Sequence, residues 1–516
     1  MNTPTSLGAV AAGHQATLDA AAFALREGGN AFDAVVAASW AACVAEPVLT
    51  SLGGGGFLVA RPYDAPTRTY DFFVHTPRRR RPPADIDFHP ILADFGSTRQ
   101  EFHIGYGAAA TPGTVKGLFC VHRELAVLPM DVLMQPAIAL ARHGVRVNAL
   151  QAYIFDVVRP IYMASAAARR RFASAADPDR LLGAGEILRL PELADTLWAL
   201  GREGERLFYE GDIAALIDAT CSAAGGHLAR DDLAAYRVVR RDPLRLDYRG
   251  ARLFANPPPA SGGLLIGFAL KLLEQLSDTV AIDEPGGLTL LAEVMRLTNA
   301  ARLQATADRL LDERLLDPPL VRSYLKQVRG RSPAARGTTH ISVIDRAGNI
   351  AALTTSNGEG CGHLLADTGI MLNNMLGEQD LNPDGFHRWR EDQRMTSMMA
   401  PAILDLDDGR SVALGSGGSN RIRSALLQVL LRLVDQRLPL EEAISRPRLH
   451  FEDGLLNIEG GFDEQVYSAL RPAFAKLNCW PGSNLYFGGV HAVALRRGAF
   501  DCSGDQRRGG VAELVR

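Results

Sequence analysis

Residues 338–356 constrain the fold most, because they have the pattern of two β-strands joined by a short loop. Apolar and β-branched residues lie on both sides of a polar, glycine-containing segment at 345–349. If that segment is the loop of an antiparallel hairpin, Ile341 faces Leu353 and Thr338 faces Ser356. Side chains that face each other directly have Cβ atoms about 4.5–5.5 Å apart. The pattern therefore predicts that the Thr338 and Ser356 hydroxyl groups lie within reach of each other.

The Gly337–Thr338 junction is a candidate site of self-cleavage. A threonine hydroxyl inside a chain is a weak nucleophile and needs a base. If the bond after Gly337 is cut, Thr338 gains an α-amine with a reference pKa of about 7.7–8.0, so a useful fraction is neutral near pH 7 and can accept the hydroxyl proton. Gly337 has no Cβ and tolerates the twisted backbone that attack on its carbonyl requires. Segment 325–337 is basic and contains Gly, Ser and Pro, which is typical of an exposed linker. The alternative is that Thr338 and Thr339 simply favour the start of a strand.

Two glycine-rich stretches have different predicted roles. Residues 414–422 read as a strand, a turn with Gly417 and Gly418, and then a helix. Main-chain N–H groups at such a turn, beside a helix N-terminus, suit a developing oxyanion. The run at 53–56 instead enters an apolar strand, with no Lys-Ser/Thr after it. Close backbone packing beside a site is therefore favoured over phosphate binding.

The apolar spacing divides the rest of the chain into helical and strand-rich parts. Residues 9–47 and most of 114–330 have helical spacing, and Gly28 is expected to end one helix. The Pro- and Gly-rich segment 257–263 predicts a rigid turn. Beyond the hairpin the pattern favours strands, interrupted by a helix at about 421–436.

Ordered motifs over nearly the whole chain resemble those of the γ-glutamyltranspeptidase family of N-terminal-nucleophile hydrolases. The motifs lie at 27–34, 52–57, 111–117, 208–211, 258–263, 338–349, 372–374, 398–401, 415–422 and 505–509. The resemblance implies an α+β fold, a four-layer αββα sandwich, made as one precursor and cut into a large chain (1–337) and a small chain (338–516) that stay associated. It implies Thr338 as the nucleophile, with its own amine as the base. Ser356 falls where the family has a second threonine that hydrogen-bonds the nucleophile, in agreement with the hairpin register.

The resemblance also assigns residues to the oxyanion and to the substrate. Gly417 and Gly418 correspond to the glycines of the oxyanion hole. Thr396 and Ser397 correspond to a serine pair that holds the substrate α-carboxylate. No metal and no cofactor are implied.

The sequence departs from the family pattern at the residues expected to recognise the substrate. Phe73 stands where the family has an arginine for the α-carboxylate, and Met375 stands where it has Gln or Glu. The acidic residue for the α-amino group corresponds to Glu378, and Asn357 is one step away from the family's asparagine. Phe73 and Met375 together predict a less polar acyl pocket, unless both merely pack. One arginine of 78–81 could replace the missing cation.

Three functions are consistent with these residues. The first is a self-processing threonine amidohydrolase or acyltransferase that cleaves γ-glutamyl amides such as glutathione, with water or an amine as acceptor. The second is an acylase of the same family that acts on a less polar amide. The third is an uncut, non-catalytic relative that serves as a binding or structural protein.

The bulk composition is that of an ordinary globular protein. A formal net charge of -3 gives no electrostatic footprint for nucleic acid. The six cysteines are scattered without metal-ligand spacing, which favours a reduced, intracellular protein. No stretch of about 20 apolar residues and no basic, then apolar N-terminal segment occurs. We therefore expect a cytoplasmic protein with no membrane partner; the oligomeric state is left open.

Overall fold

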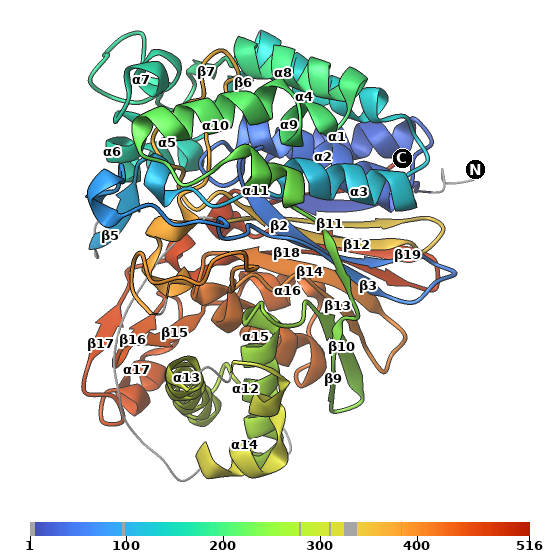
Figure 1. Cartoon of the computed structure of the whole chain (residues 1–516). Helices are drawn as coiled ribbons and strands as arrows, with labels where there is room; N and C mark the ends of the chain where they lie inside the picture. The colour runs from blue at the N-terminus through green and yellow to red at the C-terminus, as the bar shows by residue number, and fades with distance from the viewer. Residues whose placement is uncertain (1–5, 95–98, 278–279, 309–310, 325–337, 383) are drawn as a thin grey trace.

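The computed structural model describes residues 6–94, 99–277, 280–308, 311–324, 338–382 and 384–516. Figure 1 shows helices, sheet, sheet and helices stacked as four layers. The α+β class and the αββα arrangement predicted from the sequence are both confirmed.

Two antiparallel sheets form the middle layers. The seven-stranded sheet has the order β20 (Val511–Val515), β1 (Gly8–Ala12), β11 (Thr339–Asp345), β12 (Ile350–Ser356), β2 (Gly55–Arg61), β3 (Arg68–Phe72), β8 (Val239–Arg241). The six-stranded sheet has the order β19 (Ala499–Ser503), β18 (Gly489–Arg496), β14 (Ser411–Gly417), β13 (Ala402–Asp405), β10 (Ala251–Ala255), β9 (Leu244–Tyr248).

The predicted hairpin is β11 and β12, at the centre of the seven-stranded sheet. Its register is the predicted one for every paired residue, from Ile344 opposite Ile350 to Thr339 opposite Thr355. Thr338 directly precedes β11, and Ser356 ends β12. The two hydroxyl-bearing residues are therefore at the same end of the hairpin.

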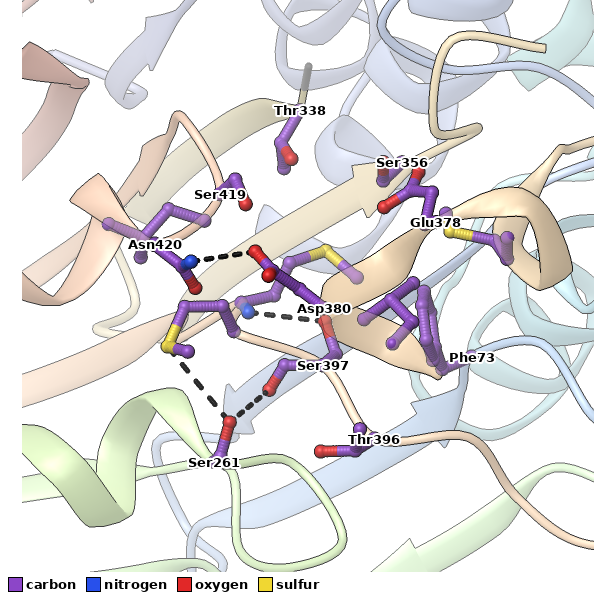
Figure 2. Close-up of a pocket in the computed structure, with 15 residues that line it drawn as sticks. Phe73, Ser261, Thr338, Ser356, Glu378, Asp380, Thr396, Ser397, Ser419 and Asn420 are labelled. Carbon is purple, nitrogen blue, oxygen red and sulfur yellow. Dashed lines mark hydrogen bonds between the residues drawn. The ribbon is translucent and has the colours of Figure 1, made fainter. Parts of the chain in front are cut away.

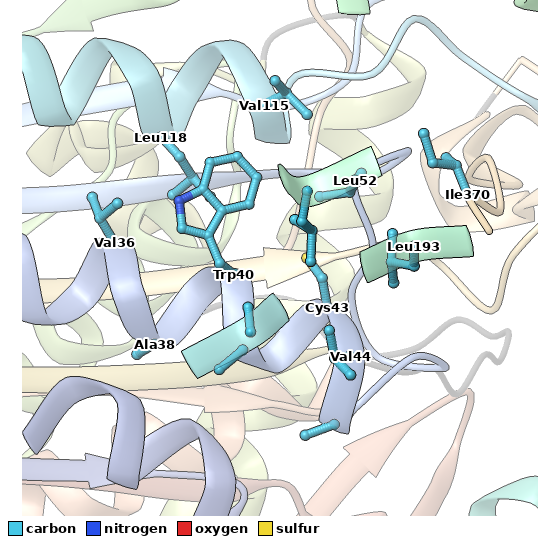
Figure 3. Close-up of a cluster of buried hydrophobic side chains, with 14 of the residues drawn as sticks. Val36, Ala38, Trp40, Cys43, Val44, Leu52, Val115, Leu118, Leu193 and Ile370 are labelled. Carbon is cyan, nitrogen blue, oxygen red and sulfur yellow. The ribbon is translucent and has the colours of Figure 1, made fainter. Parts of the chain in front are cut away.

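Three apolar cores separate the four layers. The outer core on the seven-stranded sheet surrounds the fully buried Trp40 (Figure 3). The Trp40 ring meets that of Phe119 edge-on, with centroids 6.0 Å apart. Its helices are α1 (Gln15–Arg26), α2 (Ala31–Ala45), α3 (Thr114–Leu125), α4 (Met130–His143) and α8 (Pro191–Glu203). Small residues such as Ala9 and Ala352 form the core between the two sheets. The outer core on the six-stranded sheet packs α12 (Gly262–Leu276), α13 (Pro285–Ala307) and α15 (Arg421–Val434).

Shorter elements surround these layers. They are α5 (Ala149–Val157), α6 (Arg159–Tyr162), α7 (Ala166–Phe172), α9 (Arg206–Tyr209), α10 (Asp212–Ala224), α11 (Arg230–Ala235), α14 (Pro318–Tyr324), α16 (Leu440–Ser445), α17 (Glu464–Leu470), and the small sheets β4 (His89–Asp94) with β5 (Arg99–Ile104), β6 (Val145–Arg146) with β7 (Ile187–Leu188), and β15 (Leu449–Glu452) with β16 (Leu455–Ile458) and β17 (Leu477–Cys479). In the described part of the chain, no helix has the length and apolarity to cross a membrane.

The predicted helical regions were wrong at two places. Residues 8–12 form β1 rather than a helix, because a short apolar run fits a buried strand as well as a helical turn. The prediction for 114–330 missed five strands, the short β6 and β7 and the strands β8, β9 and β10. The break at Gly28 is confirmed by its φ of +89°, and α15 confirms the predicted helix after the glycine turn.

The parts of the chain before and after Thr338 share both sheets. β11 and β12 lie between β1 and β2, and β10 pairs with β13. A cut before Thr338 would leave these ladders of hydrogen bonds in place. The predicted cleavage residue Gly337 and the segment 325–337 lie outside the described residues.

Candidate active site

A cavity of about 40 Å³ lies at the end of the hairpin where Thr338 and Ser356 meet (Figure 2). The predicted site residues that line it are Phe73, Thr338, Ser356, Met375, Glu378, Thr396 and Ser397. The lining residues without a predicted role are Ser261, Asp380, Leu381, Met398, Met399, Ser419, Asn420 and Ile422. Gly417, Gly418 and Asn357 are not part of the lining.

The two hydroxyl-bearing residues are nearly buried and positioned by the backbone around them. Thr338 is 4% exposed and Ser356 is 5% exposed. The Ser356 Oγ accepts a hydrogen bond from the Gly358 N–H at 3.1 Å. The glycine run allows β2 to approach closely, since a Cβ on Gly54 would lie 2.4 Å from the Ser356 carbonyl oxygen. The predicted close backbone packing beside the site is confirmed.

A buried carboxylate fixes the first residue of β11 directly after Thr338. Glu46, at the C-terminal end of α2, accepts hydrogen bonds from the hydroxyls of Thr17 and Thr339, each at 2.7 Å. A Cβ on Gly13 would lie 2.8 Å from the same carboxylate. The start of the strand is thus tied to the helical layer, which limits where Thr338 can move.

The glycine turn between β14 and α15 touches the backbone of Thr338. A Cβ on Gly417 would lie 2.1 Å from the Thr338 carbonyl oxygen. Gly418 has a φ of +117° and Ser419 a φ of +51°. α15 begins without a side-chain cap, and its first two N–H groups, of Arg421 and Ile422, donate to the carbonyls of Gly418 and Ser419. The positive end of the helix therefore lies at this turn. Ser419 and Asn420 are the turn residues that line the cavity, and the oxyanion role of Gly417 and Gly418 stays a prediction.

Arg508 places a buried positive charge behind the same turn. Its Nη1 would lie 3.3 Å from a Cβ on Gly417 and its Nη2 3.2 Å from one on Gly418. Burial, together with the charge of Arg421, lowers the pKa of Arg508 to about 9, so Arg508 is still a cation at neutral pH. A fixed positive charge in a buried site favours negative charge that develops next to it.

Phe73 forms an apolar wall of the cavity. Its ring stacks on Phe57 with centroids 5.5 Å apart, and Met375 lines the cavity with it. Arg394 donates to the Phe73 carbonyl oxygen and pairs with Asp71 at 3.3 Å, so this arginine is held beside the Phe73 backbone.

The arginine run does not supply the missing cation. Arg78 lies 3.6 Å from Asp392, and Arg80 pairs with Glu391. The Arg81 main chain donates to His227 at 3.1 Å. No residue of 78–81 lines the cavity among the described residues, so the suggested replacement was wrong.

Glu378 and Asn357 are placed differently from each other. Glu378 lines the cavity beside Ser356, at the end of a loop that Asn373 and Asn374 anchor. Asn357 is fully buried, and its Oδ1 accepts from the Ser51 hydroxyl at 2.9 Å outside the cavity. Asn357 therefore lies outside the cavity, where its side chain bonds Ser51 rather than facing the substrate space.

Asp380 enters the cavity from the opposite side and is held by a buried network. The Asn420 Nδ2 donates to Asp380 at 2.6 Å and to Glu452 at 2.8 Å. Burial alone would raise the pKa of Glu452, but hydrogen bonding from His450 and the charge of Arg423 lower it, so Glu452 is an anion. Burial lowers the pKa of His450 to about 4, so this histidine is neutral at pH 7.

A larger chamber of about 610 Å³ adjoins the cavity and shares Ser261, Asp380, Leu381, Thr396 and Met398 with it. Trp389 and Arg390 are among its walls. Its volume is in the usual range for small-molecule sites, roughly 300–1,000 Å³. Such a chamber beside the cavity offers room for a substrate larger than the acyl group alone.

Sequence reasoning missed several lining residues for different reasons. Ser261, Ser419 and Asn420 lie inside motifs that were singled out, so the motifs could have indicated them. Asp380 carries no such signal, because only the folding of its loop onto Asn420 brings it to the cavity.

Comparisons with known proteins identify the family. Residues 18–515 match the family model described as gamma-glutamyltranspeptidase. The Acylase ACY 1 proenzyme of Pseudomonas sp. (strain V22) is 30% identical over 521 residues, covering 95% of this chain and 90% of that protein. The glutathione hydrolase proenzyme of Escherichia coli (strain K12) is 31% identical over 494 residues, covering 87% of this chain and 82% of that protein. The solved structure of cephalosporin acylase from Bacillus halodurans has the same fold, with a TM-score of 0.86 at 22% identity over 99% of this chain and 96% of that one. The chain belongs to the γ-glutamyltranspeptidase family, whose members are enzymes of the N-terminal-nucleophile hydrolase type.

Proposed function

We propose that this protein is a self-processing threonine amidohydrolase and acyltransferase that works through an ester on Thr338. The observation that carries this proposal is the meeting of Thr338, Ser356 and the glycine turn at one cavity. The proenzyme names of the relatives support the processing step.

Processing converts the precursor into the active form. The Thr338 hydroxyl attacks the Gly337 carbonyl carbon, the peptide C–N bond breaks, and the nitrogen leaves as the Thr338 amine while an ester forms. Water then hydrolyses the ester and releases the Gly337 carboxylate and the Thr338 hydroxyl. The products are chains 1–337 and 338–516, which stay associated because they share both sheets.

Catalysis repeats the same bond changes on an amide substrate. The free Thr338 amine takes the hydroxyl proton, and the oxygen attacks the substrate carbonyl. Main-chain N–H groups of the turn at Gly417 and Gly418 stabilise the oxyanion, with Arg508 behind them. The leaving amine takes the proton, and water or another amine resolves the ester. Ser356 hydrogen-bonds the nucleophile and keeps its hydroxyl aligned.

Two classes of substrate acyl group are candidates for this reaction. Glutathione-like γ-glutamyl amides are one candidate. An acylase activity on a different amide is the second, and Phe73 favours it, because an apolar wall stands where an α-carboxylate would need an arginine. Thr396, Ser397, Met375 and Glu378 then contact the acyl chain.

A denaturing gel of the purified protein tests the proposal directly. We expect two bands, for chains 1–337 and 338–516, and one uncut band for Thr338→Ala. The processed protein should hydrolyse at least one acyl anilide. A wild-type protein that stays uncut and inactive would instead support the non-catalytic alternative.

A further inference from the structure

The charges that line the nucleophile cavity are all of one sign. Glu378 and Asp380 are acidic, and none of the described lining residues is Lys, Arg or His. Figure 2 shows the two carboxylates on opposite sides of the space below Thr338, with Glu378 near Ser356 and Asp380 near Asn420. Arg302, Arg390 and Arg394 line only the adjoining chamber, and Arg508 lies behind the glycine turn. A γ-glutamyl group would therefore bring its carboxylate into a cavity whose own charged lining residues are both acidic.

Asp380 is held in this position rather than being free to swing away. The Asn420 side chain donates to Asp380 at 2.6 Å and to Glu452 at 2.8 Å. Glu452 is itself 3.1 Å from the His450 Nε2 and 3.3 Å from Arg302. Arg302 and Arg423 face Glu452 behind the cavity, and Arg423 also interacts electrostatically with Asp380. Of these two carboxylates, only Asp380 lines the cavity.

Besides the carboxylates of Glu378 and Asp380, the side-chain oxygen of Asn420 is a third hydrogen-bond acceptor among the residues that line the cavity. The Asn420 amide can be oriented only one way, since turning it over would set its oxygen against two carboxylates. In this orientation its Oδ1 is buried and has no hydrogen-bond partner among the described residues. An acceptor of this kind beside a carboxylate suits a group with several N–H donors, such as an ammonium.

We infer that the enzyme prefers amides whose acyl part carries a protonated amine and no carboxylate. Asp380 is then a residue that determines specificity, with Glu378 on the other side of the ammonium. This inference rests on the proposed amide hydrolysis at Thr338, and it names the substrate class for that reaction. Charge-assisted hydrogen bonds of this kind are worth roughly a tenfold to a hundredfold in affinity.

Four anilides that share the same four-carbon acyl chain, and differ only in the groups on its last carbon, separate the two charges. The γ-glutamyl anilide has both the amine and the carboxylate, the 4-aminobutyryl anilide has only the amine, the glutaryl anilide only the carboxylate, and the butyryl anilide neither. We expect kcat/KM to be highest for 4-aminobutyryl, at least about tenfold above butyryl, and lowest for glutaryl. Salt should raise KM for the 4-aminobutyryl anilide more than for the butyryl anilide, since it screens ionic contacts.

Asp380→Asn tests the assigned residue with almost no change in shape. The ratio of kcat/KM for 4-aminobutyryl over butyryl should fall about tenfold. Asp367→Asn removes the same charge at an exposed position that lines neither the cavity nor the adjoining chamber, so it should change this ratio less than twofold. Competitive inhibition of the wild type by 4-aminobutyramide and by butyramide measures the same preference without a variant.

The outcomes distinguish this inference from the function on which it depends. A processed enzyme that cleaves glutaryl or butyryl anilide faster than 4-aminobutyryl anilide, or that cleaves none of the four, overturns the substrate class. A preference for the amine that Asp380→Asn leaves intact overturns the role of Asp380. A chain that is neither processed nor active overturns the proposed function itself.

Discussion

The nucleophile hairpin and the wall of the cavity are built in opposite ways. The hairpin joins Thr338 to Ser356 through one short stretch of chain, and its register follows from the position of the loop within that stretch. The wall brings together Phe73, Glu378–Leu381, Thr396–Met399 and Ser419–Ile422, which are far apart in sequence. The reactive group is therefore a local property of the chain, whereas the selection of substrate is a property of the assembled layers.

Removing the nucleophile is the strongest test of the hairpin. Thr338→Ala should abolish processing and lower amide hydrolysis by at least about a thousandfold, because no other hydroxyl occupies the strand end with its own amine. A gel and an anilide assay measure both effects. Thr338→Ser keeps the hydroxyl and should still be processed. Normal processing of Thr338→Ala would show that the cut is made elsewhere or by another protein.

A methyl group at the glycine turn tests whether the second sheet positions the nucleophile. Gly417→Ala would set a Cβ 2.1 Å from the Thr338 carbonyl oxygen, so the backbone must shift. A misplacement of about 1 Å costs roughly a hundredfold, and we expect self-processing to slow by that factor. The matched control is Gly482→Ala, since a Cβ there meets no atom within 4 Å and should leave the rate unchanged. Equal processing rates for the two variants would contradict close contact at the turn.

Both regions bury a neutral histidine, which makes stability depend on pH. Burial holds the pKa of His340 in the hairpin well below its usual value and that of His450 behind the wall at about 4. Below about pH 6.5 these histidines are protonated in the unfolded chain but stay neutral in the folded chain. Their contribution to the free energy of unfolding is therefore complete above about pH 6.5 and is lost as the pH falls towards 4.

The free energy at stake for His450 is roughly 3 kcal/mol. Urea unfolding at pH 7 and at pH 4.5 should show the loss, and His450→Gln should make it smaller. A free energy of unfolding that stays constant between these pH values would mean that His450 takes up its proton in the folded state.

Replacing Phe73 is a milder test, directed at the wall. Phe73→Arg would return a cation to the cavity, so the γ-glutamyl anilide should gain about tenfold in kcat/KM relative to the 4-aminobutyryl anilide. Phe73→Leu removes the stacking on Phe57 without adding charge and serves as the control. If Phe73→Leu shifts the preference by as much, the packing of the ring rather than the missing charge governs selection.

Features that depend on residues close together in sequence were predicted correctly, whereas features that depend on distant segments were not. The hairpin, the break at Gly28 and the helix after the glycine turn depend on neighbours along the chain, and each was correct. β1 was mistaken for helix because its short apolar run is defined only by its partners β11 and β20. The same limit applies to Asn357, which was expected to contact substrate and instead packs against Ser51.

By itself, the sequence determined where the candidate nucleophile Thr338 lies and that Ser356 ends the facing strand. The polar, glycine-containing loop at 345–349 sets the register of the antiparallel pair, so Thr338 and Ser356 lie at the same end of the hairpin. Only the tertiary structure decided the charge of the cavity, because Asp380 reaches it through a loop held by Asn420 at the start of α15. The spacing of residues along the chain does not predict such a contact, because the contact forms only when the loop and α15 pack together in the folded protein.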